Sequence, residues 1–299
     1  MSTVAASPFA SRVRDELVAQ RRRPPRLAKL VDADAHEGPV FVAEEPALYF
    51  TTTSRGGSRR PVVDVRRLDL RSLRITTVRA DANVANGMCL DRDGSLLVCE
   101  QGTFERPARI ARMDRATGET ETVVDAWRGR PLNSPNDVVV RSDGTIWFTD
   151  PSYGHLQGFR PPPSAGDHVY RHDPATGRTA VVLRGFDKPN GLAFSPDERI
   201  LYVADNGAPH RLMAFDVRGG RLTAHRVVGV TSPGHPDGVK VDRLGRILHT
   251  TAQGIAVRSS SGMRLGEISL PGAVNFAFGE PHGSLLITTD TAIWHARGV

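Results

Sequence analysis

The sequence predicts an all-β protein, specifically a six-bladed β-propeller whose blades are four-stranded antiparallel sheets. A segment with the pattern apolar strand, polar turn, apolar strand recurs six times along the 299 residues. Weaker hairpin patterns lie between these segments. Each repeat therefore has roughly four strands over about 50 residues, which is the size of a propeller blade.

The six strong segments share a short strand, a turn that usually contains Gly or Asp, and a second strand rich in Ile, Leu, Val and aromatic residues. They are "VFVAEEPALYFTT" (40–52), "MCLDRDGSLLVCE" (88–100), "VVVRSDGTIWFTD" (138–150), "LAFSPDERILYVAD" (192–205), "VKVDRLGRILHTT" (239–251) and "FAFGEPHGSLLITTD" (276–290). The first strand of a propeller blade lines the central channel. We therefore expect each segment to start near the channel.

Four weaker hairpins follow strong segments and are expected to form the outer halves of blades. They span 109–124, 169–183, 212–228 and 255–270. The stretches "DRATG" and "DPATG" within the first two are typical of hairpin loops.

The two ends of the chain are expected to meet in one blade. After Asp290 only "TAIWHARGV" remains, which is enough for one further strand. Because an open sheet edge would stay exposed, we expect "RLAKLVDAD" (26–34) to pair there and close the ring. Residues 1–25 form a predicted helical extension, with Ser7 as its N-cap and Pro8 at the first helical position. The predicted propeller domain is 26–299.

Composition excludes several classes of protein. The net charge is +6, but only "RRRPPR" (21–26) is a basic run, so no nucleic-acid partner is expected. No stretch of 18 apolar residues and no apolar signal region are present, which predicts a cytoplasmic protein without a membrane partner. Cys89 and Cys99 lack metal-site spacing and are too few for a disulfide scaffold. We expect a monomer or a weak oligomer.

A polar residue stands just ahead of the first strand in every repeat. The six are Glu37, Asn86, Asn136, Asn190, Asp237 and Asn275, at intervals of 49, 50, 54, 47 and 38 residues. A turn explains any single Asn-Gly or Asp-Gly. The register shared by "PND" (135–137), "PNG" (189–191) and "PDG" (236–238) indicates a common use instead. Six such residues would converge on the channel, and their carboxylate and amide oxygens suit a hard divalent cation.

The sequence resembles the SMP-30/gluconolactonase/LRE-like family over nearly everything after about residue 30. The resemblance is carried by "EGPVF", "NGMCLDRDGSLLVCEQGT", "LNSPNDVVVRSDGTIWFTDPSYG", "KPNGLAFSPDERILYVAD", "HPDGVKVD" and "NFAFGEP". It implies a six-bladed propeller with one divalent cation in the channel. The implied ligands are Glu37, Asn136, Asn190 and Asp237, while Asn86 and Asn275 become channel neighbours. Ca²⁺ is the expected cation, with Zn²⁺, Mn²⁺ and Mg²⁺ as alternatives.

The resemblance also implies a metal-dependent lactonase that acts on sugar lactones or related small-molecule esters. Asp237 is the candidate general base, since a ligand carboxylate can stand within reach of the attacking water. Gln101 and His235 depart from common motifs of bacterial gluconolactonases, and they are expected near the substrate. His235 fits pocket lining and solvent exposure equally well. "DPSYG" (150–154) is interpreted as a structural loop.

Two other functions remain open on the same scaffold. One is a phosphotriesterase-like or other ester hydrolase that uses the same cation. The other is a non-catalytic propeller that holds its metal for binding or structure. Fold alone does not separate these three functions.

Overall fold

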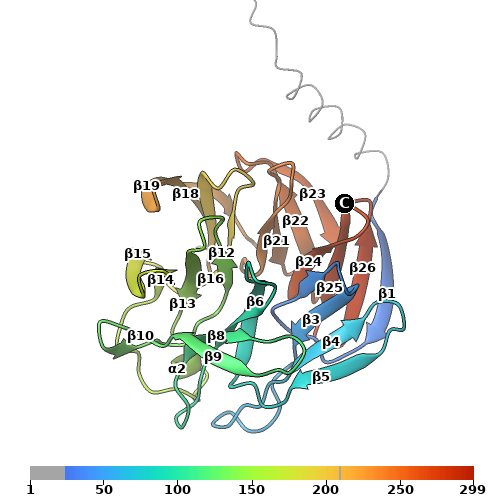
Figure 1. Ribbon diagram of the computed structural model, residues 1–299. Coiled ribbons are helices and arrows are strands. Elements are labelled where there is room, and N and C mark those ends of the chain that lie inside the picture. Colours follow the sequence, from blue (N-terminus) through green and yellow to red (C-terminus); the bar gives the residue numbers. More distant parts are fainter. Residues whose placement is uncertain (1–23, 209) are drawn as a thin grey trace, which may run out of the picture.

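The structure is a computed structural model that describes residues 24–208 and 210–299 (Figure 1). Six four-stranded antiparallel sheets are arranged in a ring, which confirms the predicted six-bladed β-propeller. The predicted helix within 1–25 lies outside the described residues, apart from its last two positions. In the described part of the chain, no helix is long and apolar enough to cross a membrane.

The blades follow one another in chain order. Blade 1 contains β2 (Val40–Val42), β3 (Ala47–Thr51), β4 (Val65–Asp69) and β5 (Ile75–Arg79). Blade 2 contains β6 (Ala85–Leu90), β7 (Leu96–Glu100), β8 (Arg109–Met113) and β9 (Thr120–Val124). Blade 3 contains β12 (Val138–Val140), β13 (Ile146–Asp150), β14 (His168–Asp173) and β15 (Arg178–Leu183).

Blade 4 contains β16 (Pro189–Phe194), β17 (Ile200–Asp205), β18 (Arg211–Arg218) and β19 (Arg221–Val230). Blade 5 contains β20 (Val239–Val241), β21 (Ile247–Thr251), β22 (Gly254–Arg258) and β23 (Arg264–Ser269). Blade 6 contains β24 (Asn275–Gly279), β25 (Ser284–Thr288), β26 (Ala292–Arg297) and β1 (Arg26–Asp32). Between blades 2 and 3 lies the short hairpin β10 (Ala126–Trp127) and β11 (Arg130–Pro131). A one-turn helix, α2 (Tyr153–Leu156), follows β13.

The first strand of the chain closes the ring. β1 pairs antiparallel with β26, with Arg26 opposite Arg297 and Asp32 opposite Ala292. Blade 6 thus combines three strands from the C-terminal end with one from the other end of the domain (Figure 1). The prediction that 26–34 supplies the missing outer strand is confirmed. Pairing the two ends leaves no unpaired edge at the junction, as closure of a propeller requires.

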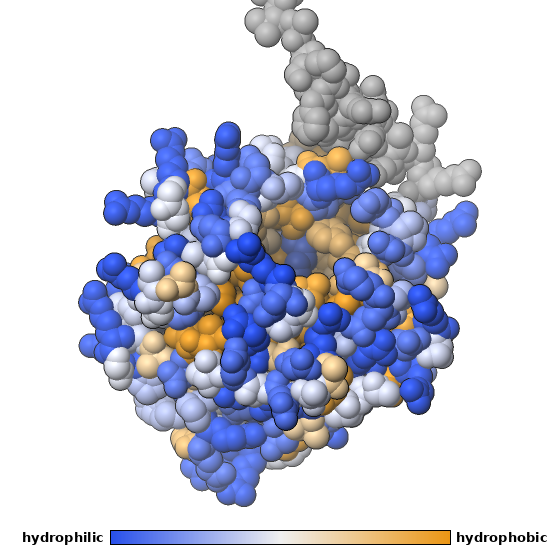
Figure 2. Space-filling view, in the orientation of Figure 1, coloured by the Kyte–Doolittle hydropathy of each residue, from blue (hydrophilic) through white to orange (hydrophobic). Residues whose placement is uncertain are grey.

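The apolar side chains of the second strands fill the space between neighbouring blades. The five residues of β7 and the five of β13 are all buried, which explains why each strand begins with a run of apolar residues. Among the described residues, each of the six blade junctions has its own hydrophobic cluster. Outside these junctions, hydrophilic residues cover most of the face shown in Figure 2. The core is therefore a ring of six packed interfaces around the inner strands.

Candidate functional site

Around the centre of the ring, the first strands of neighbouring blades contact one another between blades 1 and 2, 2 and 3, 3 and 4, 4 and 5, and 6 and 1. At one end of them lies a cavity of about 420 Å³. Seven of the eight predicted site residues line it: Glu37, Asn86, Gln101, Asn136, Asn190, His235 and Asp237. The remaining one, Asn275, lies beside the cavity, where its amide Nδ2 donates to Glu37 Oε2 at 2.7 Å. The shared register of the repeats therefore does bring these side chains together.

We call the six polar residues just ahead of the first strands the ring residues: Glu37, Asn86, Asn136, Asn190, Asp237 and Asn275. Glycines allow the ring residues of neighbouring blades to approach each other closely. A Cβ added to Gly87 would lie 2.4 Å from the backbone oxygen of Asn136, and one added to Gly191 would lie 2.2 Å from that of Asp237. Real Cβ atoms essentially never come within 3.0 Å of another heavy atom. Each of these glycines immediately follows a ring residue in the sequence. The Asn-Gly pairs therefore serve the tight packing of the ring as well as the turn itself.

The second strand of blades 2, 3 and 4 ends in an acidic residue. Its carboxylate accepts a hydrogen bond from the segment that leads to the ring residue of the same blade. In blade 3, the carboxylate of Asp150 accepts hydrogen bonds from the backbone N–H groups of Asn133 and Ser134, each at 2.9 Å. In all three blades, the residue that is held lies three positions before the ring residue. The pairs are Glu100 with Asn83, Asp150 with Asn133, and Asp205 with Asp187.

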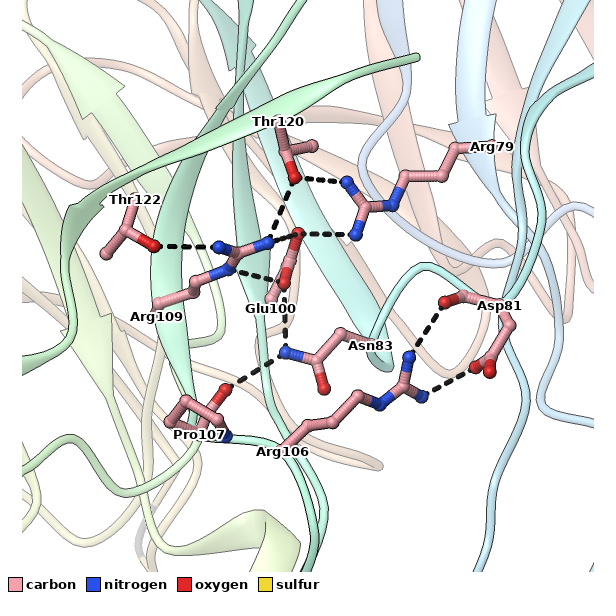
Figure 3. A network of polar contacts seen from close by, with 9 residues as sticks. All are labelled: Arg79, Asp81, Asn83, Glu100, Arg106, Pro107, Arg109, Thr120 and Thr122. Atoms are coloured by element: carbon pink, nitrogen blue, oxygen red, sulfur yellow. Dashed lines mark hydrogen bonds and ion pairs between the residues drawn. The ribbon is translucent and has the colours of Figure 1, made fainter.

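In blade 2 this acid is the centre of a larger polar network (Figure 3). Glu100 is buried and accepts hydrogen bonds from Arg109 Nε at 2.8 Å and Asn83 Nδ2 at 2.9 Å, while Arg79 forms an ion pair with it at 3.7 Å. Asn83 and Val84 both have left-handed backbone, with φ of 53° and 57°. Such backbone persists in non-glycine residues only where its surroundings hold it. The network therefore stabilises the turn that delivers Asn86 to the cavity.

Two buried carboxylates, Glu37 and Asp237, face the cavity, and the neighbouring His36 imidazole lowers the pKa of each without offsetting the effect of burial. Both hydrogen bonds of the Glu37 carboxylate end on Oε2, from Gly38 N at 3.1 Å and from Asn275, which leaves Oε1 free to bind a ligand. Burial raises the pKa of Glu37. Burial, and then the neighbouring Glu37 carboxylate, raises the pKa of Asp237 to about 8. A positive charge in the cavity would lower the pKa values of both carboxyl groups.

A third buried carboxylate, Asp137, has its own counterion. Lys240 Nζ lies 3.7 Å from Asp137 Oδ2, and the backbone N–H of Val138 donates to Oδ1 at 2.9 Å. Burial raises the pKa of Asp137, and the Lys240 ammonium opposes that rise. Lys240 does not line the cavity. Asp137 therefore has a lysine counterion, whereas the cavity that Glu37 and Asp237 line contains His36 but no lysine or arginine among the described residues.

Sequence reasoning missed one group of cavity residues, Tyr153 and Asn206. Tyr153 belongs to "DPSYG", which was interpreted as a structural loop, yet its side chain lines the cavity. Its hydroxyl oxygen accepts hydrogen bonds from Asn190 Nδ2 at 3.3 Å and Asn206 Nδ2 at 2.6 Å. Burial raises the pKa of Tyr153, so the phenol stays protonated at neutral pH. Neither residue stands just ahead of a first strand; Asn206 directly follows β17, as Gln101 follows β7, whereas Tyr153 lies three residues after β13 and has no signal in the repeats.

Within residues 24–208 and 210–299, no three His, Cys, Asp or Glu side chains are grouped so that they could hold a metal by themselves. A cation in this cavity would therefore need amide oxygens as well. Asn136, Asn190 and Asn86 line the cavity alongside the two carboxylates, and the buried Oδ1 of Asn86 has no hydrogen-bond partner. The donor set is thus oxygen-only, as hard divalent cations prefer.

Comparison with known proteins gives consistent matches. The gluconolactonase of Zymomonas mobilis is 32% identical over 231 residues, which cover 71% of this chain and 63% of that protein. Lactonohydrolase oryL of Aspergillus oryzae is 29% identical over 76% of this chain and 59% of its own length. The chain thus spans about three fifths of these two relatives.

Among solved structures, the gluconolactonase XC5397 of Xanthomonas campestris superposes with a TM-score of 0.81 at 32% identity. This match covers 91% of this chain and 89% of that one. A family profile described as "SMP-30/Gluconolactonase/LRE-like region" matches residues 35–291. The repeat pattern and the propeller agree with these matches, and the chain belongs to the SMP-30/gluconolactonase/LRE-like family.

Proposed function

We propose that the protein is a divalent-cation-dependent hydrolase that opens lactones in the channel cavity. The observation that carries this proposal is the convergence of Glu37, Asn136, Asn190 and Asp237 on one cavity. No lysine or arginine is among the described residues that line it. Two buried carboxylates without a lysine or arginine counterion are costly when the cavity holds no cation, and one divalent cation would neutralise both.

The residues present fit such a cation. Glu37 and Asp237 would supply charge and Asn136 and Asn190 would supply amide oxygens, with Ca²⁺ the expected ion and Zn²⁺, Mn²⁺ or Mg²⁺ as alternatives. When bound, the cation would supply Lewis-acid polarisation of the substrate carbonyl. Glu37 is assigned to charge balance, because Asn275 and Gly38 hold one of its oxygens.

Asp237 is assigned the role of general base. Its carboxylate lines the cavity and accepts the proton of the attacking water as the new C–O bond forms. The same carboxyl group then returns the proton to the ring oxygen as the lactone C–O bond breaks. The products are one hydroxy acid per lactone and per water consumed. The protein's own contribution is therefore a positioned base in a cavity that binds a neutral substrate.

The relatives support the substrate class. The matched proteins of Z. mobilis and X. campestris are named gluconolactonases, and the A. oryzae relative is named a lactonohydrolase. A neutral, hydroxylated lactone suits a cavity that is lined by amides and has no lysine or arginine among its described residues. The substrate proposed for this chain is accordingly a sugar lactone.

The test is a hydrolysis panel with chelator-stripped protein, before and after cation is restored. The panel contains an aldonolactone, an alkyl lactone, a phenolic lactone and a phosphotriester, and proton release reports turnover. We expect lactone opening that depends on added cation and exceeds phosphotriester cleavage. Preferential cleavage of the phosphotriester would favour the second hydrolase function instead. Cation binding with no turnover on any substrate would favour a non-catalytic propeller.

A further inference from the structure

Tyr153 is held rigidly at the wall of the cavity. The backbone N–H of Gly154 donates to Ser134 Oγ at 2.9 Å, and Ser134 Oγ donates to the carbonyl of Pro151 at 2.6 Å. Arg160, at the end of the same loop, donates to the carbonyls of Asn133, Leu132 and Thr103 at 2.9–3.0 Å, and to that of Arg106 at 3.3 Å. These bonds tie the segment to blades 2 and 3, so the phenol is in place before substrate arrives.

The hydroxyl of Tyr153 has a free hydrogen. A phenol oxygen carries one donor and can accept bonds from neighbouring donors. Here the amides of Asn190 and Asn206 both donate to the oxygen. No acceptor for the hydrogen is found among the described residues. The two amides thus donate to the hydroxyl oxygen from the protein side, and the hydroxyl hydrogen is available to a molecule in the cavity.

Because the Tyr153 hydroxyl lies beside Asn190, its hydrogen is placed to bond to a substrate group that binds there. Asn190 is one of the residues that would hold the cation, and the chemistry the cation would supply there is polarisation of the substrate carbonyl. We propose that Tyr153 is a catalytic residue that donates a hydrogen bond to the lactone carbonyl oxygen as that oxygen becomes negative. This inference rests on the proposed function. No proton is transferred from the phenol: the water oxygen bonds to the carbonyl carbon, and the C=O electron pair moves onto the oxygen that Tyr153 contacts.

The test compares Tyr153→Phe with wild type at saturating cation, on an alkyl lactone and on a phenolic lactone. We expect kcat to fall by about 10²–10³, the usual effect of losing one oxyanion donor. The loss should be similar on both substrates, because the bond goes to the carbonyl oxygen and not to the leaving oxygen. Tyr202→Phe is the matched control, since its hydroxyl is buried and has no hydrogen-bond partner in the structure. Its kcat should stay within about twofold of wild type.

Cation affinity, measured by calorimetry without substrate, separates catalysis from positioning. We expect Tyr153→Phe to bind cation within about tenfold of wild type. Weakened binding with wild-type kcat at saturation would overturn the proposal, because Tyr153 would then only orient Asn190. A much larger loss on the alkyl lactone would also overturn it, since it would indicate donation to the leaving oxygen. Wild-type protein that opens no lactone would refute the proposed function itself, whereas active wild type with an unaffected variant would refute only this role.

Discussion

Replacement of Gly191 by alanine tests the packing that brings the ring residues together. Gly191 follows Asn190 in β16 and faces the backbone of Asp237 in the next blade. A methyl group at Gly191 would lie 2.2 Å from the Asp237 carbonyl oxygen and 2.7 Å from Val239 N. Reaching 3.0 Å requires the two backbones to separate by at least 3.0 − 2.2 = 0.8 Å. Both sides of the contact are backbone, so no side-chain rotation can relieve it.

A displacement of 0.8 Å exceeds the roughly 0.5 Å within which a binding constellation must be held. We therefore expect Gly191→Ala to weaken cation affinity by about 10–100-fold, as changes in the support of metal ligands do. Overpacking should also lower the free energy of unfolding by about 1–3 kcal/mol. Calorimetric titration with Ca²⁺ and urea unfolding in the presence of chelator measure the two effects.

The matched control is Gly266→Ala in β23, where an added Cβ would meet nothing within 4 Å. This variant should keep wild-type cation affinity and should not lose stability through overpacking. If Gly191→Ala behaved like Gly266→Ala in both measurements, the close approach of the ring backbones would not position the site, and the reasoning would be wrong.

Three further substitutions test separate parts of the account. Asp237→Asn keeps an oxygen but removes the base, so kcat should fall by about 10²–10⁴ at saturating cation; near-normal kcat would leave Asp237 only a ligand and make His235 the next candidate base. Asn190→Ala should weaken cation affinity in calorimetry, and excess cation should partly restore turnover; unchanged affinity would remove Asn190 from the proposed set. Burial and the Arg258 guanidinium lower the pKa of His249 from 6.5 to about 4. The unfolded chain therefore takes up the proton first as pH falls, so wild type should lose up to about 3 kcal/mol between pH 6.5 and pH 4. His249→Gln should lose less free energy of unfolding over this pH range, measured by urea unfolding at a series of pH values. An unchanged pH dependence would contradict the lowered pKa of His249.

The repeats made the fold and the ring register predictable. Six blades repeat one pattern, so the position of Asn136 relative to β12 could be transferred to the other blades. Closure by 26–34 also followed, because a truncated last repeat leaves an edge that some other strand must cover.

Residues outside the repeat could not be placed in the same way. Tyr153 belongs to the segment between β13 and β14, whose course depends on long-range contacts such as the four carbonyls bound by Arg160, and Asn206 lies in the connection after β17. Asn275 stands just ahead of its first strand like the other ring residues, but its amide donates to Glu37 and it does not line the cavity. Only the three-dimensional structure reveals this difference. Sequence pattern thus predicted what each blade repeats, while tertiary packing decides which neighbouring side chains reach the cavity.

A crystal structure of the protein grown with Ca²⁺ tests the central claim most directly. The account predicts one cation in the channel cavity, bound through oxygens of Glu37, Asn136, Asn190 and Asp237 at about 2.3–2.6 Å. The hydroxyl of Tyr153 should face the cavity that holds that cation. A cation bound elsewhere, or a cavity that stays empty at saturating Ca²⁺ with these four side chains turned away from one another, would contradict it.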